Sequence, residues 1–210
     1  MTDAVRDAYD ARAEEYANLF LDHLDRVPLD RERLGAFARL VSPHAEVVAD
    51  VGCGPGNVVD HLAELGVKAI GYDISPALID IARRAFPGST FHVGDLTSLD
   101  IGDSSLAGIV ARYSLIHLAP AQLTDVFGEL FRVLRPRAPV LVSFFASNSS
   151  VTHGRPFDHA VVTAHELFPE TLVEEMQAVG FDRFEVSTRK PLDGERALDH
   201  GTILARRGSS

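Results

Sequence analysis

The stretch from Asp50 to Asn57, D-V-G-C-G-P-G-N, places three glycines at alternate positions directly after an apolar run. That run, residues 46–51 (E-V-V-A-D-V), has the composition of a buried strand, and residues 56–65 carry apolar side chains at helical spacing. A glycine-rich turn between a strand and a helix lets the backbone approach a ligand closely, because glycine has no side chain in the way. The stretch therefore predicts a strand–turn–helix unit whose turn lies against a ligand.

Strands and helices alternate along the chain on both sides of this unit. Apolar patterns predict further strands over residues 67–72, 90–93, 106–113 and 139–145, and two more near 183–189 and 197–205. Helices are expected from Ser75 to Phe86, over 121–134 and over 169–179. Because the strands are continuously apolar, the pattern predicts a parallel sheet covered on both faces, with a ligand at the carboxyl ends of its strands.

Length and composition favour a single domain. The chain has 210 residues, 46% of them apolar, and no apolar run approaches the roughly 20 residues of a membrane span. A formal net charge of −10 disfavours nucleic acid and anionic membranes as partners, because phosphate contacts need a basic surface. The polar N-terminus without an apolar signal core and the single cysteine, Cys53, favour the cytoplasm.

The spacing of the glycines raises the question of which nucleotide would bind. Gly52 and Gly54 fit the G-x-G-x-x-G fingerprint of dinucleotide-binding folds, but Gly56 comes one position early and Asn57 stands where the third glycine belongs. Asp73 ends the second strand, 21 residues beyond Gly52, which is the spacing at which a carboxylate meets a ribose. These residues predict a ribose-containing ligand and leave open whether the turn is an altered dinucleotide motif or a different one.

Two further motifs follow the third and fourth strands. Asp95 lies in G-D-L (residues 94–96), where a carboxylate can accept a hydrogen bond from the exocyclic amine of a base; an ordinary loop aspartate is the alternative. The segment R-Y-S-L-I-H-L, residues 112–118, leaves the fourth strand and is expected to face the glycine turn across the switch in strand order.

Together the four motifs D-V-G-C-G-P-G, G-Y-D-I-S, G-D-L and A-R-Y-S-L-I-H-L resemble the class I S-adenosylmethionine-dependent methyltransferases, in their small-molecule branch (type 11/25). The glycine motif of that family, E/D-x-G-x-G-x-G, is matched fully from Asp50 to Gly56. The resemblance covers roughly residues 9–188 and is most specific over 46–145. It implies S-adenosylmethionine as cofactor and a Rossmann-like, doubly wound α/β fold. The seven-stranded sheet would be mostly parallel with a C-terminal antiparallel strand and helices on both faces.

The resemblance also implies a role for each motif. Asp50 and the glycine turn would hold the methionine part of the cofactor, Asp73 the ribose, and Ile74, Asp95 and Leu96 the adenine. Arg112 and Tyr113 would border the methionine and the methyl group, with Tyr16 and Tyr9 lying over the cofactor. The expected cofactor-binding set is Tyr16, Asp50, Gly52, Cys53, Gly54, Gly56, Asn57, Asp73, Ile74, Asp95, Leu96 and Arg112.

The expected domain, residues 1–207, divides into four segments. Residues 1–40 would form an N-terminal helical lid and residues 45–145 the cofactor-binding core. Residues 146–168 lack clear periodicity and are expected to form an insert on the substrate side, followed by a helix and strands over 169–207.

The candidates for catalysis are His117, Tyr113 and His153, because a hydroxyl acceptor benefits from a base whose pKa lies near neutrality. A structural role for His117 and a solvated loop position for His153 are the alternatives. The six-residue spacing of His153, His159 and His165 fits no common metal pattern, so no metal site is expected.

The segment after the fourth strand, R-Y-S-L, departs from the N/D-P-P-Y/F motif of the family branch that acts on amines of DNA or protein glutamine. The departure favours a small-molecule acceptor with an oxygen, nitrogen or sulfur nucleophile, bound by a monomer or homodimer. Two alternatives stay open: an NAD-dependent oxidoreductase with a Rossmann fold, and a non-catalytic regulatory domain that binds the cofactor.

Overall fold

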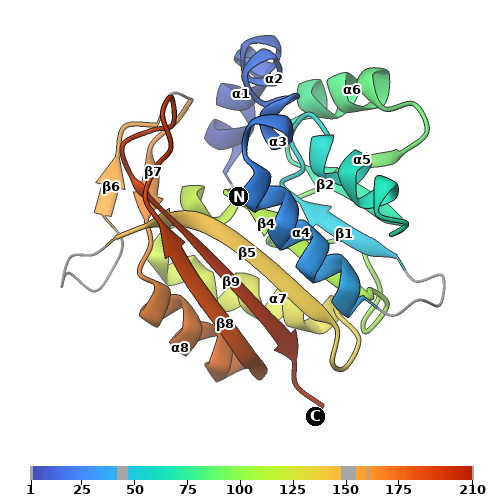
Figure 1. Ribbon diagram of the computed structural model, residues 1–210, viewed down its shortest axis with the longest axis vertical. Helices are drawn as coiled ribbons and strands as arrows, with labels where there is room; N and C mark the ends of the chain where they lie inside the picture. Colours follow the sequence, from blue (N-terminus) through green and yellow to red (C-terminus); the bar gives the residue numbers. More distant parts are fainter. Residues whose placement is uncertain (1, 42–46, 148–154, 160, 210) are drawn as a thin grey trace.

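The computed structural model describes residues 2–41, 47–147, 155–159 and 161–209. Its centre is a seven-stranded sheet with the strand order β3-β2-β1-β4-β5-β9-β8 (Figure 1). The strands are β1 (Val48–Val51), β2 (Ala69–Asp73), β3 (Thr90–Val93), β4 (Gly108–Arg112), β5 (Pro139–Ala146), β8 (Phe181–Arg189) and β9 (Asp199–Arg207). Neighbours among β1 to β5 pair in parallel, whereas β9 runs antiparallel to both β5 and β8. The expected fold class, a mostly parallel sheet of seven strands with an antiparallel C-terminal strand, is confirmed.

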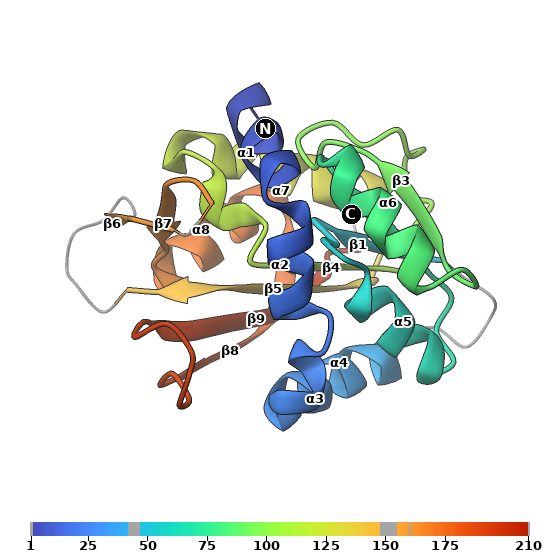
Figure 2. The same ribbon diagram turned by 90° about the horizontal axis from the view of Figure 1, so that it is seen from above.

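Helices cover both faces of the sheet. The α-helices are α1 (Asp3–Ala11), α2 (Ala13–Phe20), α3 (His23–Arg26), α4 (Pro28–Leu40), α5 (Asn57–Glu64), α6 (Pro76–Ala85), α7 (Leu123–Val133) and α8 (Pro169–Val179). Two short 3-10 helices, η1 (Leu115–His117) and η2 (Pro120–Gln122), precede α7. Seen from above, α7 and α8 lie on one side of the sheet and α3, α4 and α5 on the other (Figure 2). The helices expected over residues 1–40 and between the strands are therefore present.

The helix that follows β2 begins where the sequence predicts. The Ser75 hydroxyl oxygen accepts a hydrogen bond from the Leu78 N–H at 3.1 Å, and Pro76 occupies the first turn of α6. This cap satisfies one of the unpaired N–H groups at the start of the helix.

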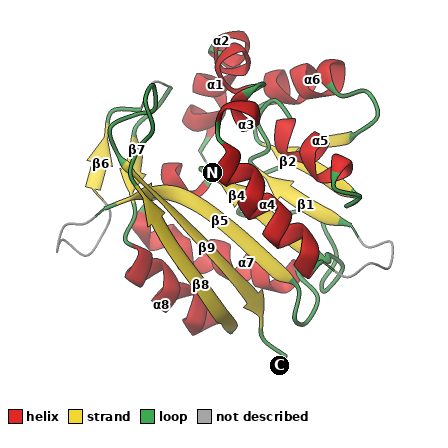
Figure 3. Ribbon diagram, viewed as in Figure 1, coloured by secondary structure: helices red, strands yellow, loops and turns green. Residues whose placement is uncertain are grey.

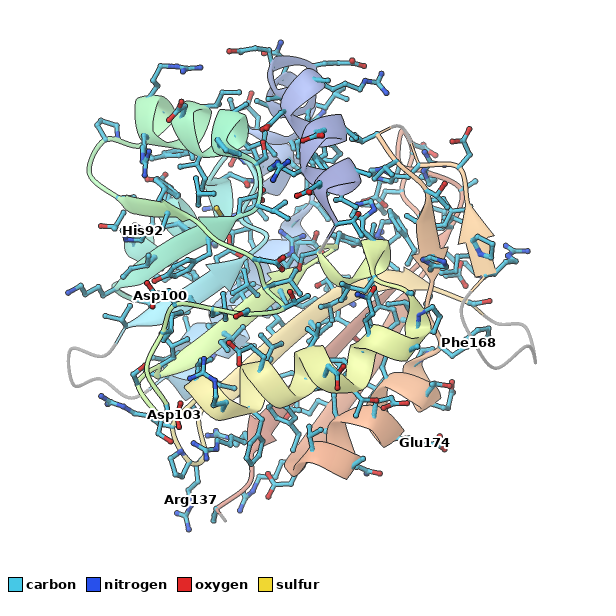
Figure 4. All side chains as sticks on the ribbon, turned by 180° about the vertical axis from the view of Figure 1, so that it is seen from behind. His92, Asp100, Asp103, Arg137, Phe168 and Glu174 are labelled. Atoms are coloured by element: carbon cyan, nitrogen blue, oxygen red, sulfur yellow. The ribbon has the colours of Figure 1, made fainter. Side chains whose placement is uncertain are left out.

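Two apolar clusters divide the core between the faces of the sheet. Val140 belongs to the cluster that includes Phe127 of α7, while the next residue, Leu141, belongs to the cluster that includes Phe37 of α4 on the opposite face. Consecutive strand residues point to opposite faces, so a strand covered on both sides must be apolar at every position. Figure 4 shows the α7–α8 face from behind, with Glu174 of α8 at the outer edge of the molecule.

The sheet has its topological switch at β1, which pairs with β2 on one side and β4 on the other. The carboxyl ends of β1, β2 and β4 meet at one edge there, where ligands bind in open parallel sheets. The glycine turn follows β1, Asp73 ends β2 and Arg112 ends β4. The three main motifs are thus brought to a single edge by the pairing of three strands.

The segment 146–168, which lacks clear periodicity, contains a second sheet. Strands β6 (Arg155–Phe157) and β7 (Ala164–Glu166) pair antiparallel beside the carboxyl end of β5 (Figures 1 and 3). The Glu166 carboxylate accepts a hydrogen bond from Arg155 Nε at 2.9 Å across the pair. Strands of three residues are too short to leave a periodic signal in sequence. None of the helices in the described ranges combines the length and the hydropathy that a membrane span needs.

Candidate cofactor site and active site

The glycine turn after β1 lies tightly against the start of the segment that leaves β4. Gly52 has φ +78°, and a Cβ atom there would lie 2.3 Å from Cβ of Ser114. The N–H groups of Gly52 and Cys53 both donate to the Tyr72 carbonyl of β2, at 2.7 and 3.0 Å. Only glycine satisfies both the left-handed backbone and the close approach at position 52.

Asp73 fastens this turn to the start of α6. Its buried carboxylate accepts hydrogen bonds from the Gly54 N–H at 2.8 Å and the Ser75 N–H at 2.9 Å. Burial raises the pKa of Asp73, and the two backbone N–H groups oppose that shift. Each carboxylate oxygen can accept two hydrogen bonds, so Asp73 retains acceptor capacity for a ligand.

Two cavities open at this edge of the sheet. The smaller, of about 40 Å³, is lined by residues of the β2 and β3 ends, among them Asp73, Ile74 and Leu96. The larger, of about 430 Å³, extends from the glycine turn past α2 and α3 to the turn between β8 and β9. Both cavities are lined by Tyr9, Tyr16, Gly52, Gly54, Arg112 and Tyr113. These shared residues make the two cavities neighbouring chambers of one site.

Two tyrosines of the N-terminal helices cover the glycine turn. Cε1 of Tyr16 lies 3.5 Å from the point that a Cβ on Gly54 would occupy, and the Tyr9 ring meets Tyr16 edge to face at 5.2 Å. The Tyr9 hydroxyl lies 2.7 Å from Nε2 of His117 in η1. Burial raises the pKa of both tyrosines, which keeps their hydroxyls protonated.

His117, a candidate for catalysis, has polar partners at both ring nitrogens. Its Nδ1 lies 3.3 Å from the Thr163 carbonyl oxygen, so Nδ1 carries the hydrogen and Nε2 accepts from Tyr9. Burial lowers the pKa of His117 to about 4, which keeps the ring neutral. In this arrangement His117 ties the N-terminal helices to η1, and its Nε2 would have to leave Tyr9 before it could act as a base.

Asp50 presents a buried acceptor to the larger cavity. The residue is 1% exposed, and its Oδ2 atom has no hydrogen-bond partner among the described residues. Burial raises the pKa of Asp50 to about 7, with Asp73 adding to the shift and Arg112 opposing it. An unpaired buried carboxylate is costly, and a cationic ligand group would relieve that cost.

Arg112 is held at the boundary of the two cavities by a buried ion pair with Asp30 of α4. Burial alone would raise the pKa of Asp30, but the hydrogen bond to His23 and the charge of Arg112 lower it to about 2. No local pattern in the sequence singles out Asp30, because its partner lies 82 residues away.

Tyr113 points to a second pair that sequence reasoning missed. It has φ +55°, and its hydroxyl lies 2.6 Å from Nδ1 of His200 in β9. Burial raises the pKa of Tyr113 to about 12 and lowers that of His200 to about 4. Glu195, which lies 3.4 Å from Nε2 of His200, forms two hydrogen bonds with Arg189, at 2.5 and 2.7 Å.

Some residues expected at the site line neither cavity. Gly56 caps α5 with φ +93°, and Asp95 accepts hydrogen bonds from the N–H and hydroxyl of Thr97. Cys53 and Asn57 line the larger cavity, and Nδ2 of Asn57 donates to the Phe20 carbonyl at 3.0 Å. His153 lies outside the described residues.

Two phenylalanines near this edge of the sheet, Phe145 and Phe168, and the loop histidines His159 and His165 have different surroundings. Phe145 and His159 line the larger cavity, whereas Phe168 is buried next to the start of α8 (Figure 4). His165 lines neither cavity, and its Nδ1 lies 3.3 Å from the Ile116 carbonyl. Within the part of the chain that the structure describes, no three His, Cys, Asp or Glu side chains are grouped as a metal site.

A family model described as a methyltransferase domain matches residues 48–137, from β1 to the turn before β5. Over these residues the chain matches the core of the class I S-adenosylmethionine-dependent methyltransferases. The solved magnesium protoporphyrin IX methyltransferase of Synechocystis, with bound S-adenosylhomocysteine, shares the fold of this chain. The two superpose with a TM-score of 0.72 at 18% identity, over 97% of this chain and 98% of that one.

Curated methyltransferases match shorter segments. The magnesium-protoporphyrin O-methyltransferase of Rhodobacter capsulatus is 38% identical over 88 residues, covering 40% of this chain and 38% of that protein. The demethylmenaquinone methyltransferase of Chlorobaculum parvum is 28% identical over 139 residues, covering 63% of this chain and 56% of that protein. The chain spans about half the length of the curated relatives it matches.

The residues at the switch point fit S-adenosylmethionine, the cofactor of this family. Asp50 offers a buried, unpartnered acceptor that suits an ammonium group, and Asp73 has acceptor capacity left for ribose hydroxyls. Ile74 and Leu96 give the smaller cavity an apolar wall that suits a base. Gly54 has no side chain, so the backbone beneath Tyr16 stays accessible to a ligand; a side chain there would narrow the site.

Proposed function

We propose that this protein transfers a methyl group from S-adenosylmethionine to a small-molecule acceptor with an oxygen, nitrogen or sulfur nucleophile. The observation that carries the proposal is the pair of adjoining cavities. Gly52, Arg112 and Tyr113 border both of them. A cofactor that extends from the smaller cavity to Asp50 would therefore meet an acceptor in the rest of the larger cavity. Binding the two reactants side by side supplies most of what such a transfer requires.

S-adenosylmethionine, when bound, supplies a methyl group already activated on a sulfonium sulfur. The protein's own residues then bind and orient. Asp73 would accept the ribose hydroxyls and Asp50 the ammonium group, while Arg112 stays fixed by Asp30. Tyr16 and Tyr9 would exclude water, and their ring faces suit a nearby cation.

Proton removal is needed chiefly for a hydroxyl acceptor. Two tyrosine–histidine pairs flank the cavities: Tyr9 with His117, and Tyr113 with His200. Burial lowers the pKa of both histidines to about 4, so both rings are neutral and each is a weaker base than an ordinary histidine. Of the two pairs, Tyr113 with His200 is the candidate to carry a proton away from the acceptor, because His117 already joins the N-terminal helices to η1.

The site must open to admit the cofactor. The smaller cavity holds about 40 Å³, whereas small-molecule sites commonly measure about 300–1,000 Å³. Tyr9 and Tyr16 stand over it on α1 and α2, which belong to the segment expected to form a lid. We infer that these two helices move outward for cofactor entry and return over it.

The relatives support a small-molecule acceptor. They include a demethylmenaquinone methyltransferase, an N-demethylindolmycin N-methyltransferase of Streptomyces griseus and a magnesium-protoporphyrin O-methyltransferase. The net charge of −10 supports an acceptor other than nucleic acid. The single cysteine, Cys53, is buried, and burial raises the pKa of its thiol, which suits a cytoplasmic protein without disulfides.

Calorimetric titration with S-adenosylmethionine, S-adenosylhomocysteine and NAD, run in parallel, tests the proposal. We expect micromolar binding of both sulfur compounds and none of NAD. Binding of NAD alone would favour an oxidoreductase. Binding of the sulfur compounds without methylation of any phenol, amine or thiol in an acceptor screen would favour a regulatory, non-catalytic domain.

A further inference from the structure

The mouth of the larger cavity has an apolar rim. Leu19 of α2 is 54% exposed and Leu192, in the turn between β8 and β9, is 47% exposed, and both line the cavity. The wall further in includes Phe20, Ile116 and Phe145. Exposed leucines that adjoin an apolar cavity favour a ligand with an apolar body.

Two arginines on the same lining lack a carboxylate partner among the described residues. The Nη2 atom of Arg26 donates to the Leu19 carbonyl at 2.5 Å. The Nη1 atom of Arg196 donates to the Asp158 carbonyl at 2.8 Å, and its guanidinium lies 5.2 Å from the centroid of the Phe157 ring. A carbonyl oxygen and an aromatic ring orient a guanidinium without neutralising its charge.

The other lining arginines differ in this respect. Arg12 is paired with Glu15 at 2.9 Å, and Arg112 is paired with the buried Asp30. Positive charge at the mouth is therefore concentrated at Arg26 and Arg196. Asp193, an exposed acidic residue of the β8–β9 turn, lines the same cavity and opposes this positive charge.

We propose that the acceptor is an organic anion with an apolar body, whose anionic group binds Arg26 and Arg196 at the mouth of the larger cavity. The inference rests on the proposed function, because it assigns the substrate class of that site. Guanidinium groups bind carboxylates and phosphates through paired N–H donors, so either anion has the required chemistry. The apolar part would lie against Phe20, Ile116 and Phe145, toward Tyr113.

Three probes of one shape test the charge requirement: 2-naphthoate, 2-naphthyl phosphate and the neutral 2-naphthamide, titrated calorimetrically with saturating S-adenosylhomocysteine. We expect at least one anion to bind ten or more times tighter than the amide. The tighter anion tells whether the group recognised is a carboxylate or a phosphate. Equal affinities for all three probes would overturn the proposal.

Variants locate the effect at the two arginines. Arg26→Gln and Arg196→Gln should each weaken the preferred anion at least fivefold and leave the amide unchanged. Asp193→Asn should strengthen anion binding, and Arg39→Gln, an exposed arginine on α4 that lines neither cavity, should change nothing. Unchanged anion binding in both arginine variants would overturn the proposal.

Titration of the same variants with S-adenosylhomocysteine separates this inference from the proposed function. Unchanged cofactor affinity in Arg26→Gln and Arg196→Gln supports the assignment, whereas a tenfold loss would assign the arginines to the cofactor and overturn it. If the unaltered protein bound no S-adenosylhomocysteine, the proposed function would fail. The naphthyl probes, titrated alone, would still report whether the mouth selects anions.

Discussion

The two sides of the site are built in different ways. On the cofactor side, the Gly52 and Cys53 N–H groups bind the Tyr72 carbonyl, and the Gly54 N–H binds Asp73, all within about one strand–helix–strand unit. On the acceptor side, the main contacts join distant parts of the chain: Asp30 with Arg112, and Tyr113 with His200. Backbone bonds between paired strands define the first side, and a few side-chain contacts define the second.

This difference indicates which side is rigid. Backbone groups at strand ends have fixed positions once the sheet forms, so Asp73 and the glycine turn are preorganised for a ligand. The helices α1 and α2 are held by side chains, through an apolar cluster shared with α6 and through single hydrogen bonds such as that of Tyr9 with His117. The β8–β9 turn is held by the ion pair of Arg189 with Glu195. Contacts of this kind can open while the sheet stays intact. We therefore expect substitutions on the cofactor side to abolish binding, and those on the acceptor side to alter closure and selectivity.

The largest effect is expected at Gly52. Gly52→Ala combines a left-handed backbone with a Cβ atom 2.3 Å from Cβ of Ser114. The free energy of unfolding should fall by about 2–6 kcal/mol, with loss of S-adenosylhomocysteine binding. Chemical denaturation and calorimetry measure both.

Gly66→Ala is the matched control, because Gly66 has the same φ of +78° with nothing within 4 Å of the added Cβ. Gly66→Ala should lower the free energy of unfolding only by the strain of a left-handed alanine backbone. Equal destabilisation by the two substitutions would show that the contact with Ser114 does not restrict position 52.

The second test addresses the ion pair between distant segments. Asp30→Asn leaves Arg112 buried without its partner and should lower the free energy of unfolding by about 3–5 kcal/mol. Asp25→Asn, at an exposed pair with Arg31, should cost no more than about 1 kcal/mol. A cost at Asp30 no larger than at Asp25 would contradict a structural role for the pair.

The free energy of unfolding at low pH provides a second test of Asp30. The pKa of Asp30 is lowered to about 2 in the folded protein, so its contribution is present above its ordinary pKa and is lost as the pH falls through about 2. Asp30→Asn should therefore flatten the fall in stability between about pH 4 and pH 2.

The ribose assignment is tested by Asp73→Ala. The loss of charge-assisted hydrogen bonds worth about 1.5–3 kcal/mol should weaken S-adenosylhomocysteine binding more than tenfold in calorimetry. The exposed Asp80→Ala on α6 serves as control. Unchanged affinity in Asp73→Ala would refute the assignment.

Cofactor affinity should also depend on pH through Asp50. Because burial raises its pKa to about 7, the carboxylate that attracts an ammonium group is lost as the pH falls below that value. S-adenosylhomocysteine should bind about tenfold more weakly at pH 6 than at pH 8, and Asp50→Asn should abolish the dependence. A pH dependence that persists in Asp50→Asn would assign it to another group.

The smallest effect is expected at the contact between α1 and η1. Tyr9→Phe removes the 2.7 Å hydrogen bond to His117 while keeping the ring on Tyr16, at a cost of about 0.5–1.5 kcal/mol. If α1 moves for cofactor entry, the association rate of S-adenosylhomocysteine should rise roughly two- to tenfold in stopped-flow measurements. Tyr72→Phe, on β2, is the control; an unchanged rate in Tyr9→Phe would mean that this bond does not limit entry.

The sequence allowed prediction of what depends on local spacing. Continuous apolar strands, the Ser75 cap and the glycine turn follow from periodicity and backbone geometry over short stretches, and each is present in the structure. The end of β2 places Asp73 beside Gly54 for the same reason, because parallel pairing of β1 and β2 brings their carboxyl ends together. The family motif and the fold could therefore be predicted from the sequence.

The tertiary structure decided which side chains meet across long separations. Asp30 at Arg112, His200 at Tyr113, and Arg26 with Arg196 on one cavity have no shared pattern in sequence. Long-range contacts depend on how helices and turns pack against the finished sheet, and no local periodicity encodes that packing. Local sequence thus determined the cofactor side of the site, at the carboxyl ends of β1 and β2. The larger cavity forms only when the folded chain brings distant segments together.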